Sequence, residues 1–321
     1  MHAAYGVLSQ GLGRLELQGG LRAERVTTAF HLATASEPFD DDYVSLYPSA
    51  LAAYTVDEAR LVKASYSKRV TRPDTRQLNP FGWREDAVNQ FQGNPALEPE
   101  YTHAFELGYQ QSFAKGTVQI TPFARHTVNA IRFIRTVTDA GVSITTFQNV
   151  ATNDSYGTDL NGSLRLGRLT GFGGVSAFRQ VTDGSNLSTD VSNSAVGWSA
   201  RGNATLGITP TLDLQASAMY RAPMNAELGR VAAMTMTNVA LRQKLFGDQA
   251  SVTLRVTDPF NLMGMGFVTD DGRFYQTSRR SFGARGVFLG VSYTFGQAPH
   301  TRPRGAEQTE ASQPGPDGQP R

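Results

Sequence analysis

Histidine is the side chain best suited to acid–base chemistry near neutral pH. The chain has five, His2, His31, His103, His126 and His300. His103 and His126 fall in consecutive strand-like segments, where either could act as a base beside a serine or aspartate. We expect them on adjacent strands but several residues apart in height, and no Gly-x-Ser-x-Gly nucleophile elbow accompanies them. A strand histidine at a lumen or rim position is the better interpretation, so no catalytic residue and no enzyme activity is predicted.

Two polar groups could bind a ligand. Trp83, Arg84, Glu85 and Asp86 place an aromatic ring and charges in the longest irregular stretch, residues 73–99, where loops commonly carry function. The alternative is a solvated loop end. Asp40, Asp41 and Asp42 could hold a hard cation such as calcium, but a triplet lacks the spaced oxygens of a calcium loop, so a simple acidic rim is favoured. We predict no metal site and no cofactor.

Composition excludes several classes of protein. The chain has 321 residues, 40% of them hydrophobic, a mean hydropathy of −0.32 and 32 glycines. No apolar run approaches the ~18 residues of a membrane helix. The net charge of +2, without a Lys/Arg run, does not indicate nucleic-acid binding. The absence of cysteine removes disulfides and thiol catalysis.

Alternating side chains predict an all-β chain. Residues 286–295 place Val287, Leu289, Val291, Tyr293 and Phe295 on one face and small or polar residues on the other. About ten residues is also the length with which a tilted strand crosses a bilayer. Similar alternation recurs from residue 3 onward, in segments such as 143–166, 195–208 and 212–222.

The connections alternate in length. Tight turns are predicted at 11–13, 57–59, 114–116, 168–171, 209–211 and 246–248, and longer loops at 34–43, 73–99, 138–142, 183–193, 223–230 and 259–280. Short turns at one rim and long loops at the other are typical of outer-membrane barrels, and Tyr54, Phe113 and Phe295 fit an aromatic girdle at the short-turn rim. About thirteen antiparallel strands are predicted, with the first and last running in the same direction. Charged residues on the polar faces argue against a soluble sandwich, which would bury them unpaired.

Several motifs carry a family resemblance. Residues 66–72 (YSKRVTR), 78–81 (LNPF) and above all 92–109 (QGNPALEPEYTHAFELGY) resemble the C-terminal barrel of TonB-dependent outer-membrane receptors, in their outer membrane protein β-barrel subfamily. The opening segment 4–24 is similar to the middle of that barrel. Residues 286–295, with Gly290, Tyr293 and Phe295, resemble the closing strand that the barrel-assembly machinery reads, although Phe288 stands where that signal usually has a polar residue. The resemblance covers about residues 1–296.

The resemblance implies a barrel of about 22 strands around a plug. The chain would then be a C-terminal part, lacking about nine strands and the plug with its TonB-contacting segment, and would not function alone. Its implied role is energised uptake of a scarce extracellular ligand, such as a siderophore, cobalamin, a sugar or a peptide. Outer-membrane lipid, the barrel-assembly machinery and, through the plug, the TonB complex are the implied partners.

The remaining expectations concern the two ends of the chain and two alternative functions. Residues 1–5 show no export signal, so we expect the chain's natural beginning to lie upstream. Residues 297–321, rich in proline and glutamine, are expected to form a disordered periplasmic tail. A passive porin and a surface adhesin or secretion barrel remain alternatives, and the upstream sequence would distinguish them.

Overall fold

A computed structural model describes residues 1–30, 39–84, 86–138, 140–187, 192–226, 229–270, 275–283 and 285–295. The strands among these residues pair antiparallel, apart from one parallel pair, and α1 (Thr75–Leu78) is the single described helix. The predicted tail, 297–321, lies outside them. The strands up to β10 are β1 (His2–Leu12), β2 (Leu15–Phe30), β3 (Phe39–Asp57), β4 (Arg60–Thr71), β5 (Trp83–Arg84), β6 (Asn89–Phe91), β7 (Glu100–Phe113), β8 (Gly116–Val137), β9 (Ser143–Leu166) and β10 (Leu169–Asp183). The others are β11 (Asn193–Gly207), β12 (Leu212–Arg221), β13 (Met224–Ala226), β14 (Gly229–Val231), β15 (Met234–Leu245), β16 (Ala250–Thr257), β17 (Gly264–Asp270), β18 (Tyr275–Ser281) and β19 (Gly286–Tyr293).

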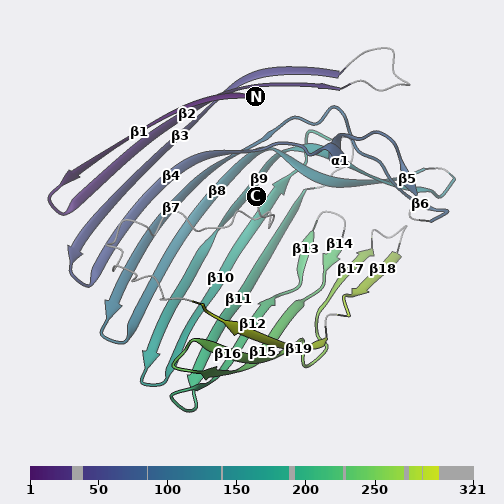
Figure 1. Cartoon of the computed structure of the whole chain (residues 1–321). Helices are drawn as coiled ribbons and strands as arrows, with labels where there is room; N and C mark the ends of the chain where they lie inside the picture. The colour runs from purple at the N-terminus through teal and green to yellow at the C-terminus, as the bar shows by residue number, and fades with distance from the viewer. Residues whose placement is uncertain are drawn as a thin grey trace.

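The main sheet is a meander whose path has thirteen strands, in the order β1-β2-β3-β4-β7-β8-β9-β10-β11-β12-β15-β16-β19. It curves into an open trough (Figure 1). The all-β fold is thus confirmed, and the meander path has the predicted thirteen strands, while β5 and β6 bring the whole sheet to fifteen. Within the described residues β1 and β19 each pair on one side only, so they are the two edges of the sheet. Because the path has an odd number of strands and every pair along it is antiparallel, β1 and β19 run in the same direction.

Connections at the two rims differ in length, as predicted. Turns of two to four residues join the strands at one rim, and the longer segments gather at the other (Figure 1). Gly13 (φ 64°) and Gly167 (φ 57°) adopt left-handed backbone in two of the tight turns, a conformation that glycine takes without strain. The turn predicted at 168–171 is shorter than expected, since β10 already begins at Leu169.

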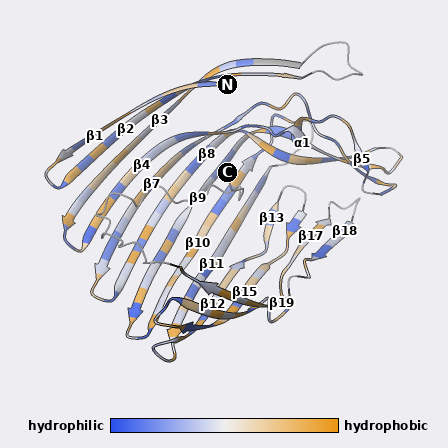
Figure 2. Ribbon diagram, in the orientation of Figure 1, coloured by the Kyte–Doolittle hydropathy of each residue, from blue (hydrophilic) through white to orange (hydrophobic). Residues whose placement is uncertain are grey.

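One face of the sheet is apolar across its whole width. Cross-strand partners share a face, so the register defines continuous rows. One row crosses ten strands from β1 to β12: Leu12, Leu15, Tyr54, Val62, Tyr109, Ile120, Leu160, Val175, Ala200 and Tyr220. A second row consists of seven leucines from β9 to β19: Leu166, Leu169, Leu206, Leu214, Leu241, Leu254 and Leu289. Figure 2 shows the alternation of apolar and polar residues along the strands.

Most of the apolar face is not covered by other described parts of the chain. Leu289 and Val291 are 71% and 74% exposed, and Leu46, Val196 and Val287 are exposed as well. A surface this apolar and this continuous is unsuited to water and fits contact with lipid. Among the described residues no helix is both long and apolar enough to cross a membrane.

The buried core is small and lies near the long-loop rim. There β8 and β9, of 22 and 24 residues, rise above their neighbours as a tall hairpin. Ala130, Ile134 and Val150 are buried on its apolar face, and Leu187 from the β10–β11 connection packs against them. The tall hairpin is therefore supported from the side by a neighbouring connection.

Three predicted loops contain regular structure instead. The 73–99 stretch holds α1, β5 and β6, and the segments 223–230 and 259–280 contribute β13, β14, β17 and β18 to a separate four-stranded sheet. The single strand expected from 231 to 245 is divided between β14 and β15. Strands β5, β6, β13 and β14 have only two or three residues, too few to show an alternating pattern, which explains why the sequence did not reveal them.

Candidate functional site

The connection between β4 and β7 carries the predicted ligand contacts, and its backbone is firmly held. At the start of α1 the Asp74 carboxylate accepts from the Gln77 amide (2.8 Å), and the Gln77 side-chain oxygen accepts from the Asp74 amide (2.9 Å). This reciprocal capping box satisfies two amides that a helix start leaves free.

Gly93 fixes the return of this connection. Its amide donates to the Asn79 carbonyl (2.9 Å), and the Asn94 amide donates to the Gln77 carbonyl (2.6 Å). A Cβ at Gly93 would collide with the carbonyl oxygens of Asn79, Gln77 and Arg76. Only glycine therefore permits the two backbone segments to lie so close.

The residues after Gly93 attach the connection to the tall β8–β9 hairpin. Asn94 donates through Nδ2 to the Phe147 carbonyl (3.0 Å). Asn149 accepts from the Glu98 amide (2.9 Å) and donates to the Glu98 carbonyl (3.0 Å). The Glu100 carboxylate accepts from the Ile131 amide (3.0 Å). The Gly-Asn-Pro-x-Leu-x-Pro-Glu block is thus a structural latch.

An aromatic stack continues from the latch to the tip of the connection. Phe147 lies against Phe133 (ring centroids 4.4 Å apart) and edge-on to Phe91 (5.3 Å). The Arg76 guanidinium lies 5.5 Å from the Phe91 centroid and 5.7 Å from that of Trp83. Trp83 is nevertheless 59% exposed. The indole is therefore positioned by a cation–π contact and still accessible to a ligand.

Of the four predicted ligand contacts, Trp83 and Arg84 form β5, an exposed strand paired with β6. Asp86 instead closes the β5–β6 turn by accepting from the Val88 amide, the Asn89 amide and the Asn89 side chain, each at 2.8 Å. These bonds, led by that from the Asn89 side chain, lower the pKa of Asp86. Glu85 lies outside the described residues. The hairpin is thus held by its own hydrogen bonds, and ligand contact at Trp83 and Arg84 stays a prediction.

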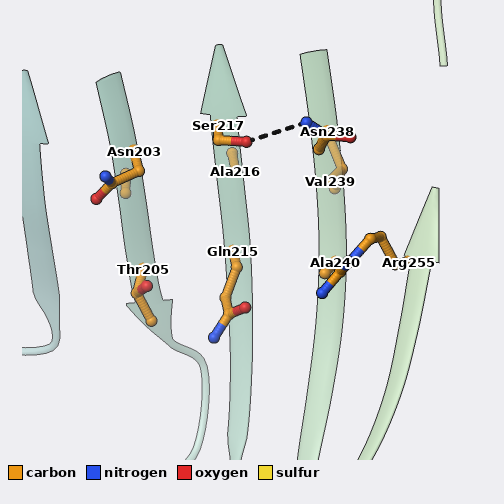
Figure 3. A pocket seen from close by; sticks show the side chains of 10 residues that line it. Asn203, Thr205, Gln215, Ala216, Ser217, Asn238, Val239, Ala240 and Arg255 are labelled. Carbon is orange, nitrogen blue, oxygen red and sulfur yellow. Dashed lines mark hydrogen bonds between the residues drawn. The ribbon is translucent and has the colours of Figure 1, made fainter. Parts of the chain in front are cut away.

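A second candidate surface lies on the polar face of β11, β12, β15 and β16. A groove of about 430 Å³ runs there. Its polar side chains come from all four strands, and Asn238 donates to the Ser217 hydroxyl at 3.3 Å (Figure 3). The groove is lined by Asn203, Thr205, Gln215, Ser217, Asn238, Arg255 and the alanines and valine between them. Sequence reasoning missed this surface, because it depends on which residues lie opposite each other on neighbouring strands.

The positions of two histidines require a correction. His103 and His126 are direct cross-strand partners, not several residues apart in height. They share the apolar face with Tyr109 and Ile120, so they do not line the lumen side. His103 contacts the Tyr66 hydroxyl (2.9 Å), and His126 contacts the Asp154 carboxylate (2.6 Å). No hydrogen bond joins either to a serine hydroxyl in the described part of the chain, so no hydrolase triad forms there.

The acidic triplet also differs from expectation. Asp40, Asp41 and Asp42 belong to strand β3 rather than to a loop. Asp42 accepts two hydrogen bonds from Arg25 (2.7 and 3.1 Å), so its charge is compensated by a guanidinium. Among the described residues no group of three or more histidines and carboxylates is placed to hold a metal ion.

The predicted assembly signal lies at the open edge of the sheet. Gly290 and Tyr293 are in β19, and Phe295 follows it with its ring 4.6 Å from that of Tyr293. Tyr293 belongs to the apolar face and Gly290 to the polar one. Recognition of these residues by the assembly machinery stays a prediction.

These features can be compared with known proteins. Residues 1–293 match the model of the outer membrane protein beta-barrel family. No curated protein matches the sequence. Among solved structures, the chain is similar to the siderophore receptor PirA from Pseudomonas aeruginosa, at 17% identity and a TM-score of 0.58, over 81% of this chain and 45% of PirA. It is also similar to the FrpB iron transporter from Neisseria meningitidis (18% identity, TM-score 0.60, 91% of this chain and 44% of FrpB). The copper transporter OprC gives 16% identity and a TM-score of 0.66, over 91% of this chain and 48% of OprC.

The chain belongs to the outer membrane protein beta-barrel family. Its fold is that of the barrels of TonB-dependent outer-membrane receptors, of which it spans slightly less than half the length. The family places the chain in the outer membrane. The similar structures named above are receptors and transporters rather than enzymes.

Proposed function

We propose that this chain is the C-terminal part of the barrel of a TonB-dependent receptor, which takes up a scarce extracellular ligand with energy supplied from the inner membrane. The single observation that carries the proposal is the sheet itself. One of its faces is apolar and suited to lipid, and its two rims differ in the length of their connections. Within the described residues its edge strands, β1 and β19, each pair on one side only. Siderophores, cobalamin, sugars and peptides are the candidate ligands.

The unpaired edges support the view that further strands belong between β19 and β1. In hydrocarbon each unsatisfied backbone group costs several kcal/mol, so an open edge is not stable there. β1 and β19 run in the same direction, and bacterial barrels are antiparallel with an even number of strands. An odd number of further strands must therefore close this sheet.

Cysteine cross-linking tests the closure in the complete receptor, since this chain has no cysteine of its own. Leu8→Cys, combined in turn with Val287→Cys, Leu289→Cys or Val291→Cys, should give no product with a short thiol cross-linker. Leu254→Cys with Leu289→Cys joins true cross-strand partners and serves as the positive control. Efficient cross-linking between β1 and β19 would contradict the proposal.

Energised uptake distinguishes the receptor from the other classes. Cells that produce the complete receptor should accumulate labelled ligand, tested with ferric chelates, cobalamin and oligosaccharides, and an inner-membrane uncoupler should abolish the accumulation. A passive porin would continue to admit solute after uncoupling. An adhesin or secretion barrel would accumulate none of the ligands. The Trp83→Ala, Arg84→Ala double variant should lower ligand affinity while leaving the barrel folded.

A further inference from the structure

The outward, apolar face of strands β1 to β4 contains a groove of about 700 Å³, which we call the apolar groove. Two neighbouring cross-strand rows supply most of its lining. The upper row is Leu8–Gly19–Ala50–Tyr66, and the lower row is Gln10–Leu17–Ala52–Ala64. Glycine and alanines occupy the middle of both rows, with larger side chains beside them. An apolar depression on a surface that contacts lipid is suited to a hydrocarbon chain.

The upper end of the apolar groove lies near the boundary between hydrocarbon and lipid headgroups. Lys68 is eight residues above Arg60, the first residue of β4. At about 3.4 Å per residue and a tilt of about 40°, this corresponds to about 21 Å along the membrane normal, close to the upper limit of an apolar band about 25 Å tall. Tyr66 opens an aromatic row with Phe105 and Tyr156, as expected at such a boundary. The long loops are on this side, so the boundary belongs to the outer leaflet.

A polar cluster stands directly above the groove. Lys68 and His103 are cross-strand partners on β4 and β7, and such partners have Cβ atoms about 4.5–5.5 Å apart. The Lys68 ammonium lies 4.9 Å from the centroid of the Tyr101 ring. His103 contacts the Tyr66 hydroxyl through Nδ1 (2.9 Å), and no hydrogen bond within the described residues uses its Nε2. The ammonium and this imidazole nitrogen are therefore placed to meet one anion.

Lys68 differs from most other cations of the apolar face in its lack of a carboxylate. Arg25 pairs with Asp42 at 2.7 Å, and His126 contacts Asp154 at 2.6 Å. Lys68 has no carboxylate partner among the described residues. Arg179 on β10 shares this property, but its guanidinium donates to Ser194 (3.1 Å), and the residue does not line the groove. Lys68 thus combines an uncompensated charge with a position at the end of an apolar channel.

We propose that the apolar groove binds an acyl chain of a phosphate-bearing lipid of the outer leaflet, with the lipid phosphate held by Lys68 and His103. Lysine binds phosphate oxygens through charge-assisted hydrogen bonds, and these are stronger where water is scarce. The acyl chain gains by filling a depression that bulk lipid would pack less closely. The site is on the opposite face of the sheet from the lumen, so it goes beyond the proposed uptake and does not depend on the ligand taken up.

Phosphatidic acid and diacylglycerol with identical acyl chains test the proposal, because they differ in the phosphate alone. The complete receptor is titrated with each lipid in a neutral detergent, and bound lipid is counted by native mass spectrometry. Lys68→Gln removes the charge above the groove. Gly19→Leu fills the groove itself, and a Cβ at Gly19 would meet no atom within 4 Å, so the barrel tolerates it. Arg179→Gln removes an uncompensated cation from the same face and is the matched control.

We expect phosphatidic acid to bind about fivefold more tightly than diacylglycerol, or better, which corresponds to one hydrogen-bonded charge pair. Lys68→Gln should abolish most of this preference, Gly19→Leu should weaken binding of both lipids, and Arg179→Gln should change neither. Equal binding of the two lipids, or no effect of Lys68→Gln or of Gly19→Leu, overturns the inference. An equal loss in Arg179→Gln overturns it too, since the attraction would then be general.

Inorganic phosphate separates a lipid site from a site for free anions. Phosphate added at millimolar concentration should not displace phosphatidic acid, because it gains nothing from the groove. Displacement would show that the cluster binds the free anion and would refute the lipid proposal. Energised uptake by Lys68→Gln should equal that of the unmodified receptor, so failure of the lipid site leaves the uptake proposal standing.

Discussion

Replacing Leu254 by arginine tests which face of the sheet contacts lipid. Leu254 belongs to the leucine row and is 44% exposed. It lies four residues above Ala250, the partner of Tyr293, whose ring contacts that of the predicted girdle residue Phe295. At about 3.4 Å per residue and a tilt of about 40°, four residues correspond to about 10 Å along the membrane normal, which is near the middle of an apolar band about 25 Å tall.

An arginine at the bilayer midplane costs about 2–4 kcal/mol in a membrane barrel. This corresponds to a decrease of about 30- to 900-fold in the ratio of folded to unfolded receptor. Thr253→Arg introduces the same side chain one residue away on the polar face, where the partners are Arg242 and Gly290 and water solvates the charge. We expect that control to cost under about 1 kcal/mol, mainly through repulsion by Arg242.

The assay is a denaturant titration of the complete receptor in lipid vesicles, with the folded fraction read from its heat-modifiable migration on gels. Leu254→Arg should shift the unfolding midpoint far more than Thr253→Arg. If both variants unfold at the same denaturant concentration, or Thr253→Arg is the less stable, the apolar rows do not face lipid and the assignment of the two faces is wrong.

Three further predictions concern the rim. Gly93→Ala should release the latch, because its methyl group meets three carbonyl oxygens, and amide exchange of residues 74–99 should speed up while the sheet stays protected. The folded-state pKa of Asp86 is lowered, so the ionised carboxylate stabilises its turn at pH values above the unfolded pKa of 3.8 and loses this effect as pH falls through the folded pKa. Trp83 fluorescence, read in a Trp198→Phe background, should therefore change below about pH 4. The same change should be absent in the Asp86→Asn variant. His126→Ala should leave ligand uptake unchanged, since its side chain is on the apolar face, and lost uptake would reopen a catalytic or transport role.

The fold was predictable where the alternation is long. Strand β9 was expected at residues 143–166 and has those bounds, because its 24 residues repeat the pattern many times. Strands β13 and β14 of the four-stranded rim sheet were not predictable, since they have three residues each. Tight turns were located as short segments, several of them with glycine, between two alternating segments. Such a turn depends only on nearby residues, so the sequence shows it.

The candidate sites were less predictable, because they depend on register. A shift of one residue moves every side chain to the other face, and the sequence alone does not fix which residues lie opposite each other. His103 and His126 were therefore misplaced in height, and the alignment of Asn203, Ser217 and Asn238 along the groove was not recognised. Trp83 and Arg84 were identified from their types, but the support from Arg76 and Phe91 required the folded connection.

The β4–β7 connection has two parts with different roles, the latch from Gly93 to Glu100 and the exposed β5–β6 hairpin. The latch from Gly93 to Glu100 bonds to backbone groups of β8 and β9 through Asn94 and Glu100, and to the Asn149 side chain through the Glu98 backbone. The β5–β6 hairpin bonds mainly to itself and exposes Trp83 and Arg84. Residues of the hairpin can therefore change without loss of the latch, whereas a change at Gly93 displaces the hairpin whatever its sequence. With the ligand contacts proposed at Trp83 and Arg84, a receptor built in this way could alter its ligand through the hairpin and keep the same rim.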